Sequence, residues 1–298
     1  MDQDKTYYLT DDGNVILLFD TRKARFILKN NDSGEIHMEA LMIRLPRFNL
    51  LWDPRADKQD RHSFSQVVRY DELNNIFFWE SQDNRDFSTF RQYVVQGHYS
   101  VPAPEYTGFN HGDFYDYENY FVPGEEKRDW PTVQKYLESS RDDARFVLLG
   151  TYKTMYPERE YDAPGTPVVV DLSDRPWFSY ENIWNTHLSM LRLANIFQLE
   201  GLAELATYNI QKTLLNMTPY HERLKELIRV LEDYYNLEPQ EDSTAHANMR
   251  KTLAYYMACY DEHIRHNNDI EAVNRFHVML NTQGDFAGEY SGAVKNIR

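Results

Sequence analysis

Histidines and neighbouring carboxylates are the residues of this 298-residue chain whose types and spacing could support chemistry. His263 and His266 are three residues apart beside Asp261 and Glu262, a spacing that can bring two imidazoles to one metal ion. A third ligand with a defined spacing is missing, so we interpret this segment as a solvated helical face. His111 lies in a loop-like tract without a second histidine at ligand spacing. The sequence therefore predicts no metal ligands.

Nucleophile and phosphate-binding signatures are also missing. The chain has no Gly-x-Ser-x-Gly turn, no Gly-x-Gly-x-x-Gly and no phosphate-binding P-loop. The single cysteine, Cys259, lies in an apolar helical context, which is typical of a small buried core residue. Carboxylate pairs such as Asp142-Asp143 and Glu125-Glu126 lie in highly charged segments and are interpreted as surface. We predict no catalytic residues, no cofactor and no enzymatic activity.

Composition and charge exclude several classes of protein. Hydrophobic residues make up 42% of the chain, enough for a folded core. One cysteine cannot form a disulfide framework within the chain. Lys plus Arg total 32 and Asp plus Glu total 47, and a net charge of −15 argues against binding to nucleic acid or to an anionic membrane. The acidic, polar N-terminus and the lack of a long apolar run predict an intracellular protein, cytoplasmic or nuclear.

The elements that would position functional residues begin with residues 12–100. Short β-prone runs at residues 14–20 and 24–29, joined by a turn, predict a hairpin, and residues 30–34 predict a break. We expect a short helix over residues 37–44 and a strand over residues 75–80. Phe87, Phe90, Tyr93 and Val94 have helical spacing, and Gly97 follows as a candidate C-terminal cap.

Residues 101–182 differ in composition from the preceding segment and are interpreted as an acidic, aromatic-rich insertion. We expect a helix over residues 130–137 and strands over residues 146–149 and 167–172, with a helix over residues 146–156 as the alternative. Acidic residues alternate with aromatic ones between Phe114 and Phe121, which would repel phosphate. This tract either lies against the protein's own surface or binds a partner protein. The candidate partner-binding residues are Tyr115, Tyr117, Tyr120 and Phe121.

The rest of the chain is predicted to be helical. Residues 183–216 form two amphipathic helices with a break near residues 199–201, and residues 217–298 form a helical C-terminal extension. Apolar stripes over residues 224–231 and 249–260 predict one helix each. Two further short helices are expected between residues 276 and 294.

Two of these segments resemble the signature of the BTB/POZ family. In the first segment, residues 37–48, a histidine starts a helix, and a proline and a phenylalanine follow its end. In the second segment, residues 87–99, two phenylalanines and a tyrosine lie on a helix that a glycine follows. Met38, Leu45, Val95 and Gln96 depart from the usual residues. The matching positions, which are mainly structural, are His37, Leu41, Arg44, Pro46, Phe48, Phe87, Phe90, Tyr93, Gly97 and Tyr99.

Downstream, residues 187–214 are similar to the closing helices of that family, and the C-terminal helices to the extension common in fungal BTB proteins. The resemblance implies an α+β domain, a small sheet flanked by helices, in two parts (residues 12–100 and 183–216). It also implies a protein–protein interaction module, because relatives self-associate and some recruit a cullin scaffold for ubiquitination. The alternatives are a scaffold without a cullin link and, in another class, a hydrolase built on the insertion.

Overall fold

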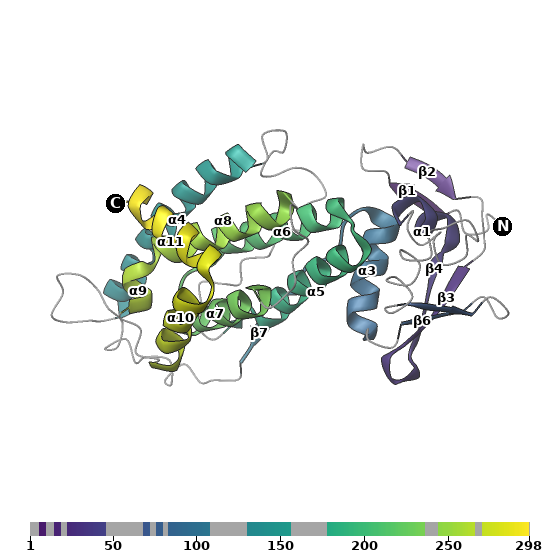
Figure 1. Cartoon of the computed structure of the whole chain (residues 1–298), viewed down its shortest axis with the longest axis horizontal. Coiled ribbons are helices and arrows are strands. Elements are labelled where there is room, and N and C mark those ends of the chain that lie inside the picture. Colours follow the sequence, from purple (N-terminus) through teal and green to yellow (C-terminus); the bar gives the residue numbers. More distant parts are fainter. Residues whose placement is uncertain are drawn as a thin grey trace. The chain divides into compact units, whose positions relative to one another are not determined.

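The computed structural model of the protein describes residues 6–9, 15–18, 23–45, 68–71, 76–79, 83–107, 130–155, 178–235, 244–265 and 270–297 (Figure 1). The chain forms two compact units. Unit 1 comprises Met1–Ser100 and Ser189–Leu205, and unit 2 comprises Val101–Leu188 and Ala206–Arg298. Helices α5 (Glu181–Phe197) and α6 (Glu200–Asn216) each contribute residues to both units.

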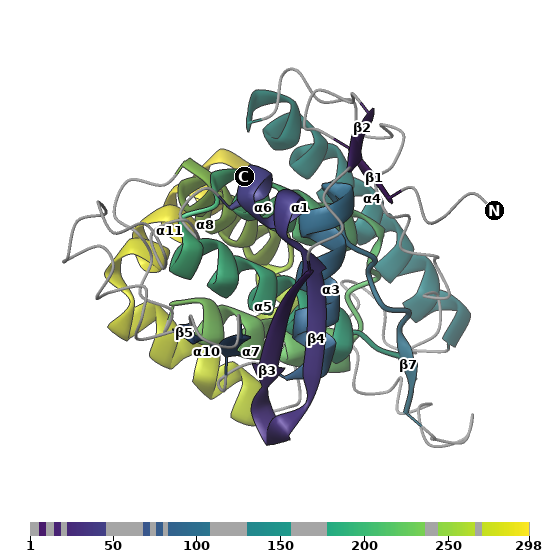
Figure 2. The ribbon, with the colours of Figure 1, turned by 90° about the vertical axis from the view of Figure 1, so that its right-hand side faces the viewer.

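Unit 1 contains a mixed four-stranded sheet in the order β4-β3-β6-β5. Its strands are β3 (Lys23–Leu28), β4 (Ser33–His37), β5 (Arg69–Asp71) and β6 (Ile76–Trp79). Strand β3 pairs antiparallel with β4, beside which it lies in Figure 2, and parallel with β6. Strands β1 (Thr6–Leu9) and β2 (Val15–Leu18) form a separate antiparallel pair. The described residues are mostly helical and also form small sheets, which confirms the predicted α+β class.

The predicted hairpin between residues 14–20 and 24–29 is wrong. Strand β2 pairs with β1, and β3 pairs with β4 instead. The predicted break after β3 is the turn of the real hairpin, where a short 3-10 helix (Lys29–Asn31) reverses the chain. Asn31 has a φ of 61°, a left-handed conformation that asparagine tolerates better than most residues.

Two helices of unit 1 agree with the sequence patterns. Helix α1 (Met38–Arg44) directly follows β4, and α3 (Asn84–Gln96) follows Asp83. The Asp83 carboxylate accepts a hydrogen bond from the Asp86 backbone N–H at 2.8 Å, which caps the N-terminus of α3. Gly97 ends the helix with a φ of 74°, a conformation that favours glycine.

The core of unit 1 lies between the sheet and α3. Along β3, Ala24, Phe26 and Leu28 alternate with more exposed residues, as in a strand with one buried face. Phe87 of α3 occupies the space over Gly34 of β4, where an added Cβ would lie 2.0 Å from its ring. The buried rings that meet in this core are Phe26, Phe77, Trp79, Phe87, Phe90 and Phe197.

Unit 2 is mainly helical, with one short strand pair, β7 (Glu105–Tyr106) and β8 (Phe178–Ser179). Helix α8 packs against α4 and α11, and α10 packs against α7 and α11. Its helices, besides the parts of α5 and α6, are α4 (Trp130–Met155), α7 (His221–Tyr235), α8 (Thr244–Cys259), α9 (Asp261–Arg265), α10 (Ile270–Thr282) and α11 (Gly284–Ile297). The predicted helices at the end of the chain are confirmed, and so is the break between α5 and α6 at Gln198 and Leu199.

Several expectations about unit 2 need correction. Residues 146–149 belong to α4, so the strand prediction is wrong and the helical alternative holds. Leu137, Ala144 and Leu148 are buried at helical spacing, which fixes this stretch as a helix against its neighbours. His263 is also buried, with 3% of its surface exposed, so the solvated-face interpretation is wrong. Cys259 is half-buried, which is less than expected of a core residue.

The bounds of the two units differ from those of the regions that the sequence predicts. The sequence separated residues 101–182 from residues 217–298, whereas both belong to unit 2 together with residues 183–188 and 206–216. Only residues 189–205 of the predicted closing helices join unit 1. The predictions for residues 109–121 and 167–172, and the motif residues Pro46 and Phe48, lie outside the described residues.

Candidate interaction surface

Most of the described motif residues form the inside of unit 1. Leu41, Phe90 and Tyr99 have no exposed surface, and Phe87 is 2% exposed. The Trp79 ring packs edge-on against Phe90, with the ring centroids 5.4 Å apart. These residues therefore hold the sheet and helices together and cannot contact a partner in the folded unit.

Arg44 joins the two motif segments. It is buried, and its guanidinium lies over the Tyr93 ring, 5.6 Å from the ring centroid. Its Nη2 also approaches Gly97, where an added Cβ would lie only 2.5 Å away. The glycine thus serves both the left-handed turn after α3 and the packing of Arg44, so the end of α3 is fixed against α1.

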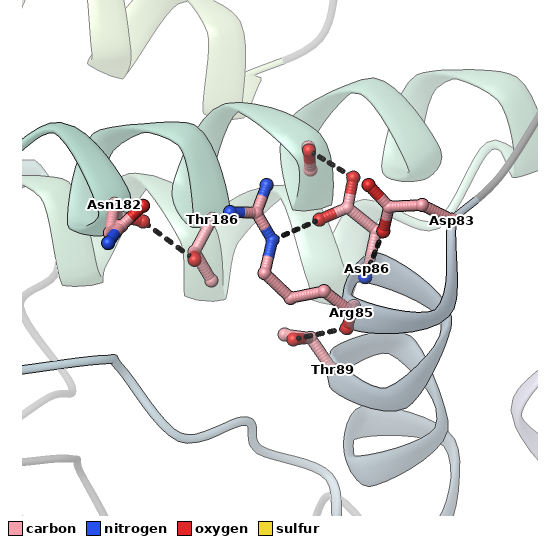
Figure 3. Close-up of polar contacts among 7 residues, drawn as sticks. Asp83, Arg85, Asp86, Thr89, Asn182 and Thr186 are labelled. Carbon is pink, nitrogen blue, oxygen red and sulfur yellow. Dashed lines mark hydrogen bonds and ion pairs between the residues drawn. The ribbon is translucent and has the colours of Figure 1, made fainter.

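Polar contacts fix the other end of α3 within unit 1 (Figure 3). The Ser189 hydroxyl on α5 donates a hydrogen bond to the Asp86 carboxylate at 2.7 Å. The Arg85 Nε lies 3.4 Å from the other oxygen of that carboxylate. Asp86 is 9% exposed, so these contacts satisfy a charge that burial would otherwise disfavour.

Helix α1 has a second side that exposes two apolar residues. Ala40, Leu41 and Arg44 are buried, whereas Met42 and Ile43 are 40% and 43% exposed. An isolated exposed apolar residue needs no explanation, but here two adjacent ones are exposed on a seven-residue helix. Glu39, which is half-buried, lies three and four residues before them and therefore on the same side of the helix. We call Met42 and Ile43 the α1 outer face. The sequence identified α1 through its motif residues but missed this face, because exposure depends on the tertiary packing.

The aromatic candidates of the insertion cannot be placed against this surface. Tyr115, Tyr117, Tyr120 and Phe121 all lie outside the described residues. Of the insertion, the structure describes residues 101–107, α4 and residues 178–182. Their role in partner binding stays a prediction.

One serine–histidine contact in unit 2 bears on the hydrolase alternative. His263 Nε2 lies 3.3 Å from Ser140 Oγ. The Ser140 hydroxyl donates its proton to the backbone carbonyl of Tyr136 at 2.9 Å, so Nε2 must be the donor to Ser140 Oγ. A histidine that donates to a serine cannot remove the serine's proton, so this geometry does not activate Ser140 as a nucleophile.

The described ranges also bear on metal sites, membrane spans and the single cysteine. Among these residues, no group of three or more His, Cys, Asp or Glu side chains is arranged to hold a metal ion. None of the helices in the same part of the chain is both long enough and apolar enough to cross a membrane. Burial and the charge of Asp143 raise the pKa of Cys259 to about 12, so its thiol is protonated and a poor nucleophile at neutral pH.

Comparisons with known proteins return no match, whether against family models, curated proteins or solved structures. The geometry of unit 1 and the motif residues are therefore the basis for a proposed function.

Proposed function

We propose that unit 1 is a protein–protein interaction module that self-associates through the α1 outer face. The observation that carries this proposal is the exposure of Met42 and Ile43 on a helix whose opposite side is locked into the core. Apolar surface that faces water is stabilised when a partner covers it. A helix fixed by Arg44 and Tyr93 presents that surface without a large ordering cost.

The element order of unit 1 supports a BTB/POZ-like module. A hairpin (β3–β4), a short helix (α1), a strand (β6), an amphipathic helix (α3) and then parts of a helical pair (α5 and α6) follow one another. The sequence resemblance implies this order for such a domain, with two differences. The expected hairpin of residues 14–20 and 24–29 is replaced by β3–β4, and β5 lies between α1 and β6. The motif residues Leu41, Phe87, Phe90 and Tyr99 lie in its core, as family-motif positions with a structural role would.

Charge restricts where a second copy of the chain can bind, and this face is compatible with one. Two chains of net charge −15 repel each other, so a contact between copies is least unfavourable where the surface is uncharged. Met42 and Ile43 provide two uncharged side chains for such a contact, beside the single carboxylate of Glu39. An apolar patch is also complementary to itself, as a twofold-symmetric interface requires.

The proposal is tested by light scattering on the full chain. Met42→Asp with Ile43→Asp places two carboxylates on each copy at the interface, so we expect the dimer to become a monomer. Val278→Asp is the matched control, because Val278 is an exposed apolar residue on α10 of unit 2. A wild-type chain that is monomeric at all concentrations, or a dimer that the double variant leaves intact, would contradict the proposal.

Recruitment of a cullin distinguishes an adaptor from a scaffold. An adaptor for a cullin-type ubiquitin ligase should co-purify with a cullin, and disruption of unit 1 should abolish this. Phe90→Asp is the disrupting variant, since Phe90 has no exposed surface. A stable dimer that binds no cullin would identify a scaffold or regulatory protein.

A further inference from the structure

Unit 2 has a pocket that the proposed function does not use. Its volume is about 250 Å³, room for roughly eight water molecules. Helices α4, α8, α9 and α11 contribute its walls. Part of the lining is apolar and comes from Ala144, Val147, Ala258, Val294 and Ile297.

The polar part of the lining is asymmetric in charge. It includes Asp143, Asp261 and Glu262, and none of the lining residues is Lys or Arg. Asp261 already has a cation, because Arg265 Nε donates to its carboxylate at 2.7 Å, and the Tyr290 hydroxyl donates to the same oxygen. Within the described ranges, Asp143 and Glu262 have no such cationic partner.

The negative charges of Asp143 and Glu262 act on other residues of the pocket lining. Glu262 helps to raise the pKa of Tyr136, after burial, and Asp143 does the same for Cys259. Burial disfavours a charge of either sign at these residues, whereas the two carboxylates disfavour only a further negative charge. The carboxylates would therefore attract a ligand that carries a positive charge.

His263 supplies a hydrogen-bond acceptor to the same pocket. Its side chain lines the pocket, is 3% exposed and stacks on the Tyr136 ring at a centroid distance of 4.9 Å. Burial and the charge of His221 lower its pKa to about 4, so the ring is neutral at pH 7. Since Nε2 donates to Ser140, Nδ1 carries a lone pair, and this atom has no hydrogen-bond partner among the described residues.

We propose that this pocket binds an alkylammonium group, carried either by a free amine or by a lysine side chain. The ammonium nitrogen donates to His263 Nδ1 and lies in the field of Asp143 and Glu262. The alkyl chain contacts the apolar wall formed by Val147, Val294 and Ile297. A neutral ligand would lack the attraction to the carboxylates, and an anion would be repelled.

Calorimetric titration of the full chain tests this proposal with three probes. The probes are n-pentylamine, Nα-acetyl-lysine methylamide and the uncharged n-pentanol. We expect at least one of the two amines to bind and pentanol to bind at least about tenfold more weakly. Tighter binding of pentylamine identifies a free amine as the source, whereas tighter binding of the lysine derivative identifies a lysine side chain. Failure of both amines, or equal binding of pentanol, would overturn the proposal.

Variants at the rim locate the binding. Asp143 and Glu262 are exposed, so Asp143→Asn and Glu262→Gln should leave the fold intact. Each should weaken amine binding about fivefold, the upper range for an exposed ion pair. Asp142→Asn is the matched control, because it removes the same charge from the neighbouring position outside the pocket lining. An equal loss with the control variant would show a diffuse effect of negative charge and contradict the assignment to this pocket.

Discussion

The two units of this protein have cores of different chemistry. In unit 1, the buried rings of Phe26, Phe77, Trp79 and Phe90 pack on one another behind a sheet. In unit 2, a fully buried arginine, Arg223, lies between the rings of Tyr180 and Tyr220, 4.7 Å from each ring centroid. Burial of apolar area stabilises the first core, whereas the second also needs each buried polar group to keep its partners.

This difference predicts which substitutions each unit tolerates. The apolar core is sensitive to any polar atom that enters it. The helical core already contains polar groups, so it is sensitive to the loss of one specific partner or to a change of protonation.

Phe90→Asp should abolish folding of unit 1. Loss of a buried phenylalanine costs about 3–5 kcal/mol, and an unpaired buried carboxylate adds a further penalty. Scanning calorimetry should show the loss of cooperative unfolding from unit 1. Ser88→Asp, at an exposed position of the same helix, is the control and should unfold like the wild type. Equal transitions in both variants would show that Phe90 does not lie in the core.

Arg223→Ala should destabilise unit 2 by about 3–5 kcal/mol, because it removes a buried cation that interacts with its surroundings. The Arg223 Nη1 donates to the Thr218 carbonyl at 3.1 Å. Burial raises the pKa of Glu226, and the Arg223 charge offsets part of this increase. Arg223→Met keeps the volume of the side chain and should lose less stability. Chemical denaturation of both variants measures the difference, and an equal loss would mean that packing volume alone matters at this position.

The stability of unit 2 should fall as the pH falls below about 6.5. Burial lowers the pKa of His187 to about 3, so the unfolded chain binds a proton in this window that the folded chain does not. The unfolding free energy then decreases by up to about 1.4 kcal/mol for each pH unit. The lowered pKa of His263 also decreases the unfolding free energy as the pH falls, down to about pH 4. The raised pKa of Glu226 has the opposite effect at pH values above 4.5, the normal pKa of a glutamate, because the folded state binds more protons there.

The contribution of His187 is isolated by comparison with His187→Gln. Its Nε2 lies 3.4 Å from Thr213 Oγ1, a hydroxyl that donates to the Asn209 carbonyl, and a glutamine amide can replace the imidazole as donor. Denaturation of both proteins between pH 4 and pH 7 should show a shallower pH dependence in the variant. Parallel curves would contradict the burial of a neutral imidazole at this position.

Two glycine-to-alanine substitutions should change the stability of the protein in opposite directions. Gly97→Ala should destabilise unit 1 by about 1–2 kcal/mol, because residue 97 has a φ of 74° and Arg44 occupies the space of a Cβ. Gly288→Ala lies in α11 of unit 2 with open space around it, and should stabilise the protein by about 0.5–1 kcal/mol. Melting temperatures measure both changes, and a shift of the same sign in both would refute the difference in conformation.

Local signals explain what the sequence could predict. Helix α3 has a capping aspartate, apolar residues at helical spacing and a terminal glycine, so its extent was predictable within two residues. The break between α5 and α6 was predictable for a similar reason. Strand pairing was not, because residues 15–18 and 23–28 are compatible with several partners and the choice depends on contacts distant in sequence.

The burial of single polar residues could not be predicted from the sequence either. His263 lies in a short helix beside Asp261 and Glu262, which locally resembles a surface. Its burial depends on Tyr136 and Ser140 of α4, more than a hundred residues earlier in the chain. The α1 outer face was missed for the related reason that the sequence did not show which side of α1 packs against α3.

Hydrogen–deuterium exchange at several protein concentrations can detect self-association through the α1 outer face. We expect the backbone amides of α1 (Met38–Arg44) to exchange more slowly as the concentration rises, whereas those around exposed Val278 of α10 should not change. Concentration-independent exchange in α1, or protection confined to another element, would contradict it.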